Sequence, residues 1–378
     1  MIEGSIGIVA MKILAAADLH LGMKFSGYPE VQAQLSGARF TALKRLIETA
    51  NREECSLFLI AGDLFDRVTV SRKDIMRTTS LLNEFQGELV ALLPGNHDFF
   101  SSGGALWQNF AESAGDRVLL LKKQQVYDLQ PYGPTVKLYA APCSSKHSRV
   151  NGLAGLSPLK ERDEKLLYLG MAHGSLAGIS FDSQGDYFPM TGEELEKLGL
   201  DLWIVGHTHN QYPAAEREEA AFIIPGTPEP DGFDCRHGGK AWLLEVTPDN
   251  KIKKKSLNTG TYRFSREDIE INADSDLEEL FSGYRDPDMA NTLSGVNLKG
   301  RLPREKMTIL RKLIKELEES LFRIRINDSQ VAEEITPDLV DHEFTQGSFP
   351  YLLLKGLIED GDMEALQAAY SLLEEVRA

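Results

Sequence analysis

The sequence predicts an α/β sandwich followed by a small α+β domain. Short apolar runs alternate with amphipathic stretches early in the chain, whereas later runs follow one another directly. This order favours a sandwich over a purely parallel sheet. The length of 378 residues suits two domains. With 42% hydrophobic and 26% charged residues, the composition argues against a wholly disordered or fibrous chain.

Short apolar runs, often bounded by Gly, Pro or Asp, predict the strands of the first domain. They are Lys12–Ala17, Leu57–Ala61, Leu89–Leu93, Val118–Leu121, Val136–Ala141, Leu166–Ala172, Leu202–Val205, Ala221–Ile224 and Ala241–Val246.

Amphipathic stretches between these runs predict helices. Ser36–Arg52 places its apolar residues on one helical face. Ser71–Gln86 and Ala105–Ala114 do the same. Thr191 and Glu194 form a capping box, and the helix that they begin ends at Gly199.

The pattern changes near Thr261, where an α+β domain is expected. Its predicted strands are residues 262–271, 293–298 and 322–326. The predicted helices are Ser275–Tyr284, with Ser275 and Glu278 as a capping box, and Pro303–Leu321. Two further helices, Phe349–Glu359 and Met363–Val376, flank Gly361. The expected boundaries are therefore 1–260, 261–346 and 347–378.

Charge excludes one class of function. Lys plus Arg number 41 and Asp plus Glu 57, so the net charge is −16. A small basic DNA-binding module is therefore not expected, although metal ions or a local basic groove can still attract phosphate.

Cysteine usage and the N-terminus indicate the compartment. Cys55, Cys143 and Cys235 are far apart, which disfavours a disulfide framework and a cysteine zinc site. A cytoplasmic location fits best, and no apolar run approaches the roughly 20 residues that a membrane helix needs. Charges at Glu3 and Lys12 argue against a signal peptide, so residues 1–10 are expected to be a dispensable extension or to follow an upstream start.

Five of the predicted strands are followed by groups that can bind a metal. Ligands of α/β sheets gather at the carboxyl ends of strands, so five such ends can converge on one point. A glycine precedes three of these groups and is expected to let the backbone turn sharply. The segments are Asp18-Leu-His20, Gly62-Asp63-Leu-Phe-Asp66, Pro94-Gly95-Asn96-His97-Asp98, His173 and Gly206-His207-Thr-His209.

The donor types predict the cofactor. Carboxylate, imidazole and amide donors without cysteine suit Mn²⁺, Fe²⁺ or Zn²⁺ better than Ca²⁺ or Mg²⁺. Seven candidate ligands exceed the needs of one ion, and two ions that share a carboxylate would use them all. Two ions about 3.5–4 Å apart suit in-line attack of a bridging hydroxide on phosphorus.

The ordered set DLH, GDLFD, GNHD, H and GHTH resembles the calcineurin-like metallophosphoesterase superfamily. The forms GDLFD and GNHD and the small second domain are similar to the SbcD-type DNA repair exonucleases, bacterial relatives of the meiotic-recombination-eleven nuclease. The resemblance covers residues 11–260 by motif. It implies a four-layer α/β/β/α sandwich with a small C-terminal α+β capping domain. Val68 and Asp98 depart from the pattern of protein phosphatases.

The resemblance also implies roles for individual residues. Asp66 would orient His97 through its carboxylate, and His97 would face the scissile phosphate and protonate the leaving oxygen. Two divalent ions would be bound, most simply Mn²⁺, with Fe²⁺, Zn²⁺ or Mg²⁺ as alternatives. The first ion would take Asp18, His20 and His209, the second Asn96, His173 and His207, and Asp63 would bridge them.

The implied function is Mn²⁺-dependent cleavage of DNA, as a 3′-to-5′ exonuclease on duplexes and an endonuclease on single strands. The implied partners are DNA, an SMC-like ATPase of the SbcC type docking on residues 347–378, and a second copy of the chain. The dimer contact would use the apolar faces of Ser71–Gln86 and Ala105–Ala114. The chain has no GxxxxGK[ST] loop of its own.

Several alternatives stay open at this point. The chain could be a small-molecule phosphodiesterase or phosphomonoesterase, or a non-catalytic scaffold on the same fold. The apolar helix faces could simply pack on their own domain.

Overall fold

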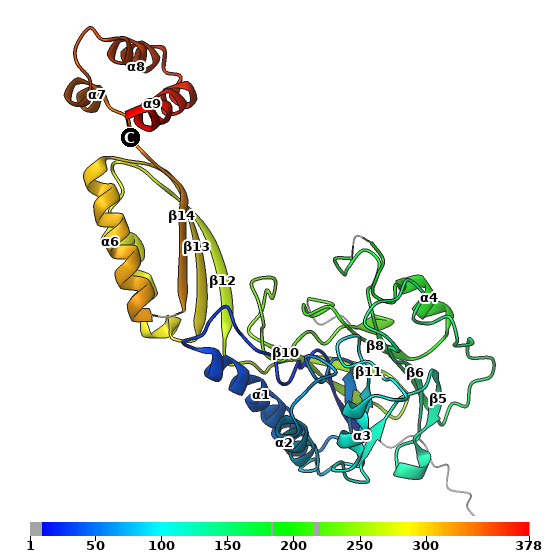
Figure 1. Ribbon diagram of the computed structural model, residues 1–378. Coiled ribbons are helices and arrows are strands. Elements are labelled where there is room, and N and C mark those ends of the chain that lie inside the picture. The colour runs from blue at the N-terminus through cyan, green and yellow to red at the C-terminus, as the bar shows by residue number, and fades with distance from the viewer. Residues whose placement is uncertain (1–9, 183, 215–219, 322, 378) are drawn as a thin grey trace, which may run out of the picture. The chain divides into compact units, whose positions relative to one another are not determined.

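A computed structural model describes residues 10–182, 184–214, 220–321 and 323–377 (Figure 1). The chain divides into two compact units, and each is described by itself. The first comprises the residues up to Phe264 together with Asn291–Leu293, and the second comprises Ser265–Ala290 and Ser294–Ala378. The expectation for residues 1–10 falls almost wholly outside the described residues.

The first unit contains a six-stranded sheet in the order β11-β10-β1-β2-β3-β4. Strands β1 to β4 are parallel neighbours, and β10 and β11 extend the sheet in antiparallel fashion. The bounds are β1 Met11–Ala16, β2 Leu57–Ala61, β3 Leu89–Leu93, β4 Val118–Leu120, β10 Lys240–Val246 and β11 Ile252–Asn258.

A second sheet in this unit has five strands in the order β5-β6-β7-β8-β9. All pairs are parallel except β5 with β6. Strand β5 is largely exposed and was not predicted, because its residues lack an apolar run. The bounds are β5 Gln125–Asp128, β6 Val136–Ala141, β7 Leu167–His173, β8 Leu202–Gly206 and β9 Phe222–Ile223.

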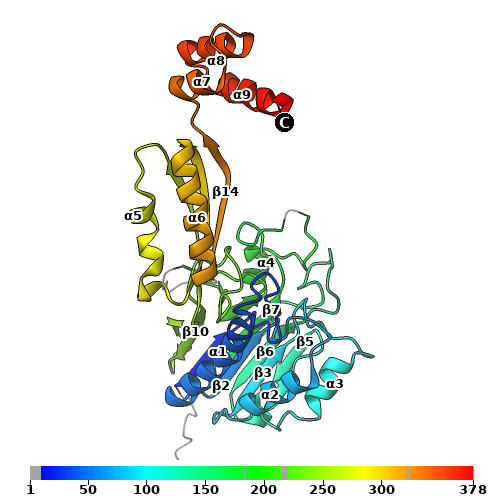
Figure 2. The same cartoon turned by 60° about the vertical axis from the view of Figure 1, so that its left-hand side comes forward.

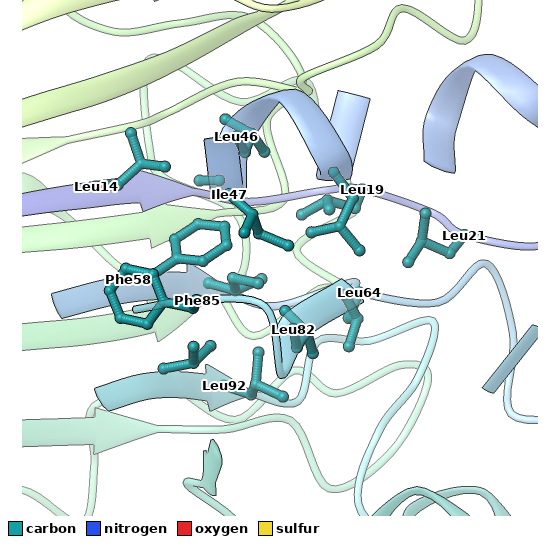
Figure 3. Packing of buried hydrophobic residues seen from close by; sticks show 14 of the residues in the cluster. Leu14, Leu19, Leu21, Leu46, Ile47, Phe58, Leu64, Leu82, Phe85 and Leu92 are labelled. Carbon is teal, nitrogen blue, oxygen red and sulfur yellow. The ribbon is translucent and has the colours of Figure 1, made fainter. Parts of the chain in front are cut away.

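Buried side chains hold these sheets together as layers. Successive residues of a strand point to opposite faces. In β2, Leu57 and Leu59 join one core with residues of both sheets, while Phe58 and Ile60 join a second core against the helices. Figure 3 shows this second core, where Phe58 and Phe85 pack beside Leu46 and Ile47.

Helices cover the outer faces of the two sheets. The first sheet is covered by α1 (Gln32–Arg52), α2 (Arg72–Leu82) and α3 (Ala105–Ala111), and the second by α4 (Gly192–Lys197) and its flanking loops. The four-layer sandwich and all nine predicted strands of this unit are therefore confirmed. The capping box at the start of α4 is present.

The apolar faces of α2 and α3 pack on their own unit, as one alternative allowed. Ile75, Leu82, Trp107 and Phe110 are all buried in the core beneath the helices, whereas Met76 is 55% exposed. The residues expected to form a dimer contact are therefore mostly occupied by packing within the chain. A homodimer itself stays a prediction.

The second unit contains a three-stranded sheet in the order β12-β13-β14, with β13 and β14 parallel. Helix α6 lies along this sheet (Figure 2), and its apolar face, which includes Leu310 and Leu317, belongs to the core of the unit. The expected capping box at the start of α5 is wrong, because Asp276 rather than Ser275 accepts the first backbone N–H groups. The bounds are β12 Arg263–Ile271, α5 Leu277–Ser282, β13 Thr292–Leu302, α6 Arg304–Leu321 and β14 Ile324–Glu333.

Three helices end the chain, where two were expected. Helix α7 (Pro337–Glu343) was missed because it is short and four of its seven residues are charged or polar; Thr336 caps it. Helices α8 (Phe349–Asp360) and α9 (Met363–Arg377) meet at Gly361, which adopts φ 69°. Among the described helices, none has the length and apolarity to cross a membrane.

Candidate metal centre

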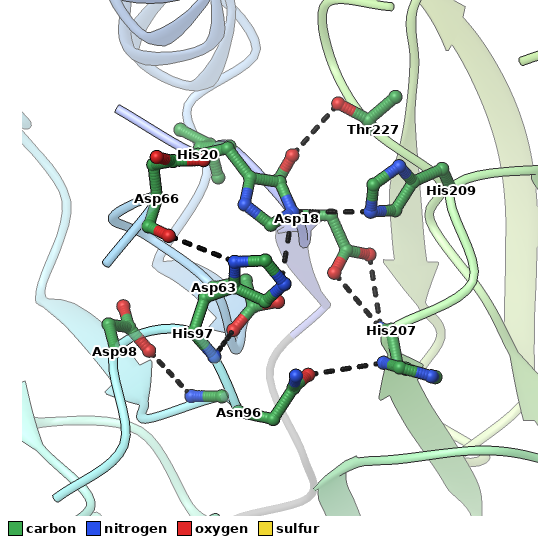
Figure 4. Close-up of polar contacts among 12 residues, drawn as sticks. Asp18, His20, Asp63, Asp66, Asn96, His97, Asp98, His207, His209 and Thr227 are labelled. Carbon is green, nitrogen blue, oxygen red and sulfur yellow. Dashed lines mark hydrogen bonds and ion pairs between the residues drawn. The ribbon is translucent and has the colours of Figure 1, made fainter. Parts of the chain in front are cut away.

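The carboxyl ends of β1, β2, β3, β7 and β8 converge on one point, as the strand ends predicted. Figure 4 shows the side chains that follow β1, β2, β3 and β8. Strands of both sheets contribute, so the point lies at the carboxyl ends of the two packed sheets. All the candidate ligands are buried except His207 and His209, which are half-buried. They are Asp18, His20, Asp63, Asn96, His173, His207 and His209.

Three of these side chains form the first group. The Nε2 atoms of His20 and His209 lie 3.2 Å apart. A carboxylate oxygen of Asp18 completes a set whose ligand atoms all lie within 4.8 Å of one another. This group therefore presents one carboxylate and two imidazoles to a common point.

A second group gathers around the amide oxygen of Asn96. His173 Nε2 lies 3.0 Å from Asn96 Oδ1, and His207 Nδ1 lies 3.1 Å from the same atom. The Nδ1 atom of His173 lies 2.9 Å from the carbonyl oxygen of Ala61 and donates to it, which leaves Nε2 free to face the group.

Asp63 lies between the two groups. Its Oδ2 atom is 3.3 Å from His173 Nε2 and 3.7 Å from His20 Nε2. Its other oxygen accepts a hydrogen bond of 2.8 Å from the backbone N–H of His97. One carboxylate therefore reaches both groups at once, which is the position that a bridging ligand requires.

The residues present fit a pair of divalent cations. Nitrogen ligands bind transition metals at about 2.0–2.1 Å, so two imidazoles on one ion have nitrogens about 3–3.5 Å apart, as His20 and His209 do. The amide nitrogen of Asn96 is buried and has no hydrogen-bond partner among the described residues, while its oxygen faces two imidazoles. Carboxylate, imidazole and amide donors suit Mn²⁺, Fe²⁺ or Zn²⁺.

The glycines beside the ligands are needed mainly for space. Gly62 has φ 91°, as the expected sharp turn requires, but the same reason is wrong for Gly95 and Gly206, which lack positive φ. A Cβ on Gly95 would lie 2.1 Å from Asp63 Oδ1, and one on Gly206 would lie 1.9 Å from the Ala61 carbonyl oxygen. Close packing of backbone against ligands therefore excludes a side chain there.

The ligands themselves carry unusual backbone angles. Asp63 has φ 50° and His207 has φ 98°, and Asp18 and His20 are also in the left-handed region. Such conformations cost about 1–3 kcal/mol each in residues other than glycine and cluster at functional sites. The surrounding sheets and hydrogen bonds must hold these residues in place.

Burial and neighbouring charges shift the acidity of the ligands. Burial raises the pKa of Asp18 to about 6. Burial opposes ionisation of both members of the Asp63–His173 pair, but their mutual attraction outweighs it. The pKa of Asp63 is held well below its usual range, and the pKa of His173 rises to about 9. Burial and the nearby His173 lower the pKa of His207 to about 3.

The expected pairing of the Asp66 carboxylate with the His97 ring is wrong. His97 Nδ1 lies 2.9 Å from the backbone carbonyl oxygen of Asp66, not from its carboxylate. That carboxylate pairs with Arg67, whose Nε lies 2.9 Å away. The ring of His97 also lies close enough to His20 and Asp63 for the three to share a cation.

Two further aspartates support the site, and the sequence analysis assigned neither of them a role in it. Asp98 is buried and accepts backbone N–H groups from Gly95 at 2.7 Å and Phe65 at 3.0 Å, which ties the second and third strand ends together. Burial raises its pKa to about 7. Asp231 contacts His209 Nδ1 at 3.0 Å, but it lies in a loop with no strand or motif to mark it. The sequence did mark Asp98, because this residue completes the GNHD motif.

Comparisons with known proteins agree with this geometry. A profile of the calcineurin-like phosphoesterase family matches residues 11–211. The uncharacterized metallophosphoesterase YhaO of Bacillus subtilis is 24% identical over 301 residues, which cover 77% of this chain and 69% of YhaO.

Two solved structures are similar at lower levels. The protein TT1561 of Thermus thermophilus is 12% identical with a TM-score of 0.41, over 66% of this chain and 100% of that one. Purple acid phosphatase PPD1 of yellow lupin is 12% identical with a TM-score of 0.43, over 67% of this chain and 52% of that one.

Metal affinity should rise with pH. The pKa of His173 near 9 means that the metal-free protein keeps a proton on this ligand at pH 7, and a cation must displace it. Mn²⁺ affinity should therefore increase about tenfold per pH unit while one proton leaves per ion bound. Isothermal titration of the metal-free protein at pH 6.5, 7.5 and 8.5 measures this. Equal affinities at the three values would contradict the ionisation assigned to His173.

Proposed function

Because the chain belongs to the calcineurin-like phosphoesterase family, we propose that it is a metal-dependent nuclease that hydrolyses phosphodiester bonds of DNA. One observation carries the reaction class: the Asp63 carboxylate lies within 3.7 Å of an imidazole from each of two ligand groups. A shared carboxylate between two such groups suits a pair of cations. Two cations are the arrangement used for in-line displacement at phosphorus.

The bound ions would supply a water of lowered pKa and stabilise charge on the phosphoryl oxygens. The protein's own residues supply position and a proton. The Asp66 carbonyl accepts from His97 Nδ1, so Nε2 is the nitrogen that can move a proton to or from a substrate. The backbone N–H of His97 holds Asp63, which keeps the imidazole next to the bridging carboxylate. We assign His97 to protonation of the leaving oxygen.

A cavity beside the site supports a nucleic-acid strand as the substrate. Its volume is about 610 Å³, and it is lined by His207 and His209 together with Phe181, Phe233 and Arg236. Phe181 is 99% exposed. An exposed aromatic ring and a guanidinium beside a phosphate-cleaving centre offer base stacking and phosphate attraction. The forms GDLFD and GNHD support the SbcD-type assignment.

The partners are further proposals. An SMC-like ATPase would dock on the C-terminal helices, where Phe349 is 75% exposed, Leu352 60% and Leu372 62%. These apolar side chains of α8 and α9 are exposed and do not pack between the helices. A homodimer and a cytoplasmic location are proposed on the family resemblance and the cysteine usage.

The central test is hydrolysis with Mn²⁺ of end-labelled duplex DNA, single-stranded DNA and a chromogenic phosphodiester. We expect the wild type to cleave DNA, and Asp63→Asn to lose that activity together with at least one bound Mn²⁺. Asp116→Asn is the matched control, because Asp116 is an exposed aspartate outside the site. Cleavage of the small ester with both DNAs untouched would favour a small-molecule enzyme. Absence of metal and of every activity would favour a scaffold.

The roles of His97 and Asp66 can be separated. His97→Ala should reduce kcat on single-stranded DNA by about 10²- to 10⁴-fold, the usual contribution of a general acid. Asp66→Asn should change kcat by less than about threefold, because the backbone carbonyl that orients His97 remains. Metal content measured by mass spectrometry should stay at two in Asp66→Asn. A loss for Asp66→Asn as large as that for His97→Ala would show that the carboxylate itself is needed.

Substitution of Phe181 should distinguish a nucleic-acid strand from a small ester as the substrate. Stacking of a base on an aromatic side chain contributes about 1–3 kcal/mol, so Phe181→Ala should raise KM for single-stranded DNA by about fivefold or more. The chromogenic ester lacks a base to stack, so its kinetics should not change. Val150→Ala is the matched control, since Val150 is also an exposed apolar residue. Equal kinetics of Phe181→Ala and wild type on DNA would exclude stacking there.

A further inference from the structure

The second nitrogen of His209 is held by a carboxylate. His209 Nδ1 lies 3.1 Å from Asp231 Oδ1 and 3.0 Å from Oδ2, while Nε2 faces His20. The Asp231 side chain is 9% exposed. Because an ionised carboxylate only accepts, Nδ1 must carry a proton, and in the neutral imidazole that binds a metal the lone pair is therefore on Nε2, toward the cation position.

Two further side chains contact Asp231, and a third contacts the backbone of His209. Arg39 of α1 places Nη2 3.5 Å from Asp231 Oδ2, and the fully buried Arg39 side chain donates from Nη1 to the Leu19 carbonyl at 2.6 Å. The Cys235 thiol lies 3.1 Å from Asp231 Oδ1. His237 Nε2 lies 2.8 Å from the His209 carbonyl oxygen. The carboxylate and the ring that it holds therefore have little freedom to turn.

In the part of the chain that the structure describes, no other candidate imidazole has a carboxylate on the nitrogen that faces away from the ligand groups. His173 donates from Nδ1 to the neutral Ala61 carbonyl. His20 Nδ1 is buried, and the described part of the chain offers it no hydrogen-bond partner. His207 turns Nδ1 itself toward Asn96. An anionic partner makes a ligating imidazole more basic than a neutral carbonyl does.

We infer that Asp231, held by Arg39, is a positioning residue that fixes the Nδ1–H form of His209 and makes the Asp18–His20–His209 position the tighter of two cation positions. This inference rests on the proposed two-cation centre. The remaining charges act in the same direction. The first position has the carboxylate of Asp18 in addition to the shared Asp63, whereas the second has the neutral amide of Asn96.

The test measures Mn²⁺ binding to the metal-free full-length protein by isothermal titration, without any activity assay. The wild type should show a tight and a weak class of site. Asp231→Asn keeps an acceptor oxygen but loses the charge, and should weaken the tight class about tenfold; Asp231→Ala should weaken it up to about 100-fold. Asp234→Asn is the matched control, because Asp234 is an exposed aspartate three residues along, and its binding should equal that of the wild type.

Loss of Asp231 leaves the buried Arg39 without its carboxylate, which can impair folding. The double variant Arg39→Leu with Asp231→Asn removes both charges, and its circular dichroism and melting temperature show whether it is folded. A folded single or double variant that binds the tight Mn²⁺ as the wild type does would overturn the inference. Two equal sites in the wild type would also overturn it. A wild type that binds no Mn²⁺ would instead refute the proposed metal centre.

Discussion

The rest of the structure depends on how one buried anion, the Asp63 carboxylate, is compensated. An ionised carboxylate removed from water costs several kcal/mol unless it is hydrogen-bonded and faces positive charge. Its near neighbours are the backbone N–H of His97 and the imidazoles of His173 and His20. Imidazole is also the side chain that a transition metal binds in its neutral form. The groups that stabilise the metal-free fold are therefore the groups that a cation would use.

This dual role explains the crowded backbone around the site. For one carboxylate to reach imidazoles from several strands, the strand ends must approach more closely than ordinary side chains allow. Gly95 and Gly206 provide that approach, and Asp63 and His207 accept strained backbone angles within it. The cores on both faces of the first sheet hold the strand ends in register against this strain.

The sequence predicted the strands and their meeting point well, because both follow from local patterns. Apolar runs mark strands, and the ends of parallel strands meet at one edge whatever the loops do. The sequence could not predict which group of a residue, its side chain or its backbone carbonyl, turns toward a neighbour. A motif shows that Asp66 lies near His97, but not whether the carboxylate or the carbonyl turns toward the ring. Likewise Ser275 and Asp276 are both acceptable caps, and only the path of the chain decides between them. Asp231 comes from a loop far along the chain, and its pairing with Arg39 and His209 exists only in the folded protein.

The net charge of −16 adds a physical link between the cations and the substrate. Without cations, the centre presents the carboxylates of Asp18 and Asp63 to an incoming phosphate, and the whole protein repels a polyanion. A pair of divalent ions would bring more positive charge than these two carboxylates neutralise, so the local sign of the charge would reverse. The cavity lined by His207 and His209 opens directly on this point. In the proposed enzyme, binding of a phosphodiester would therefore be coupled to cation binding by electrostatics, before any catalytic step. On this argument an acidic surface does not oppose the proposed nuclease function, because the bound cations would attract a phosphodiester to the centre.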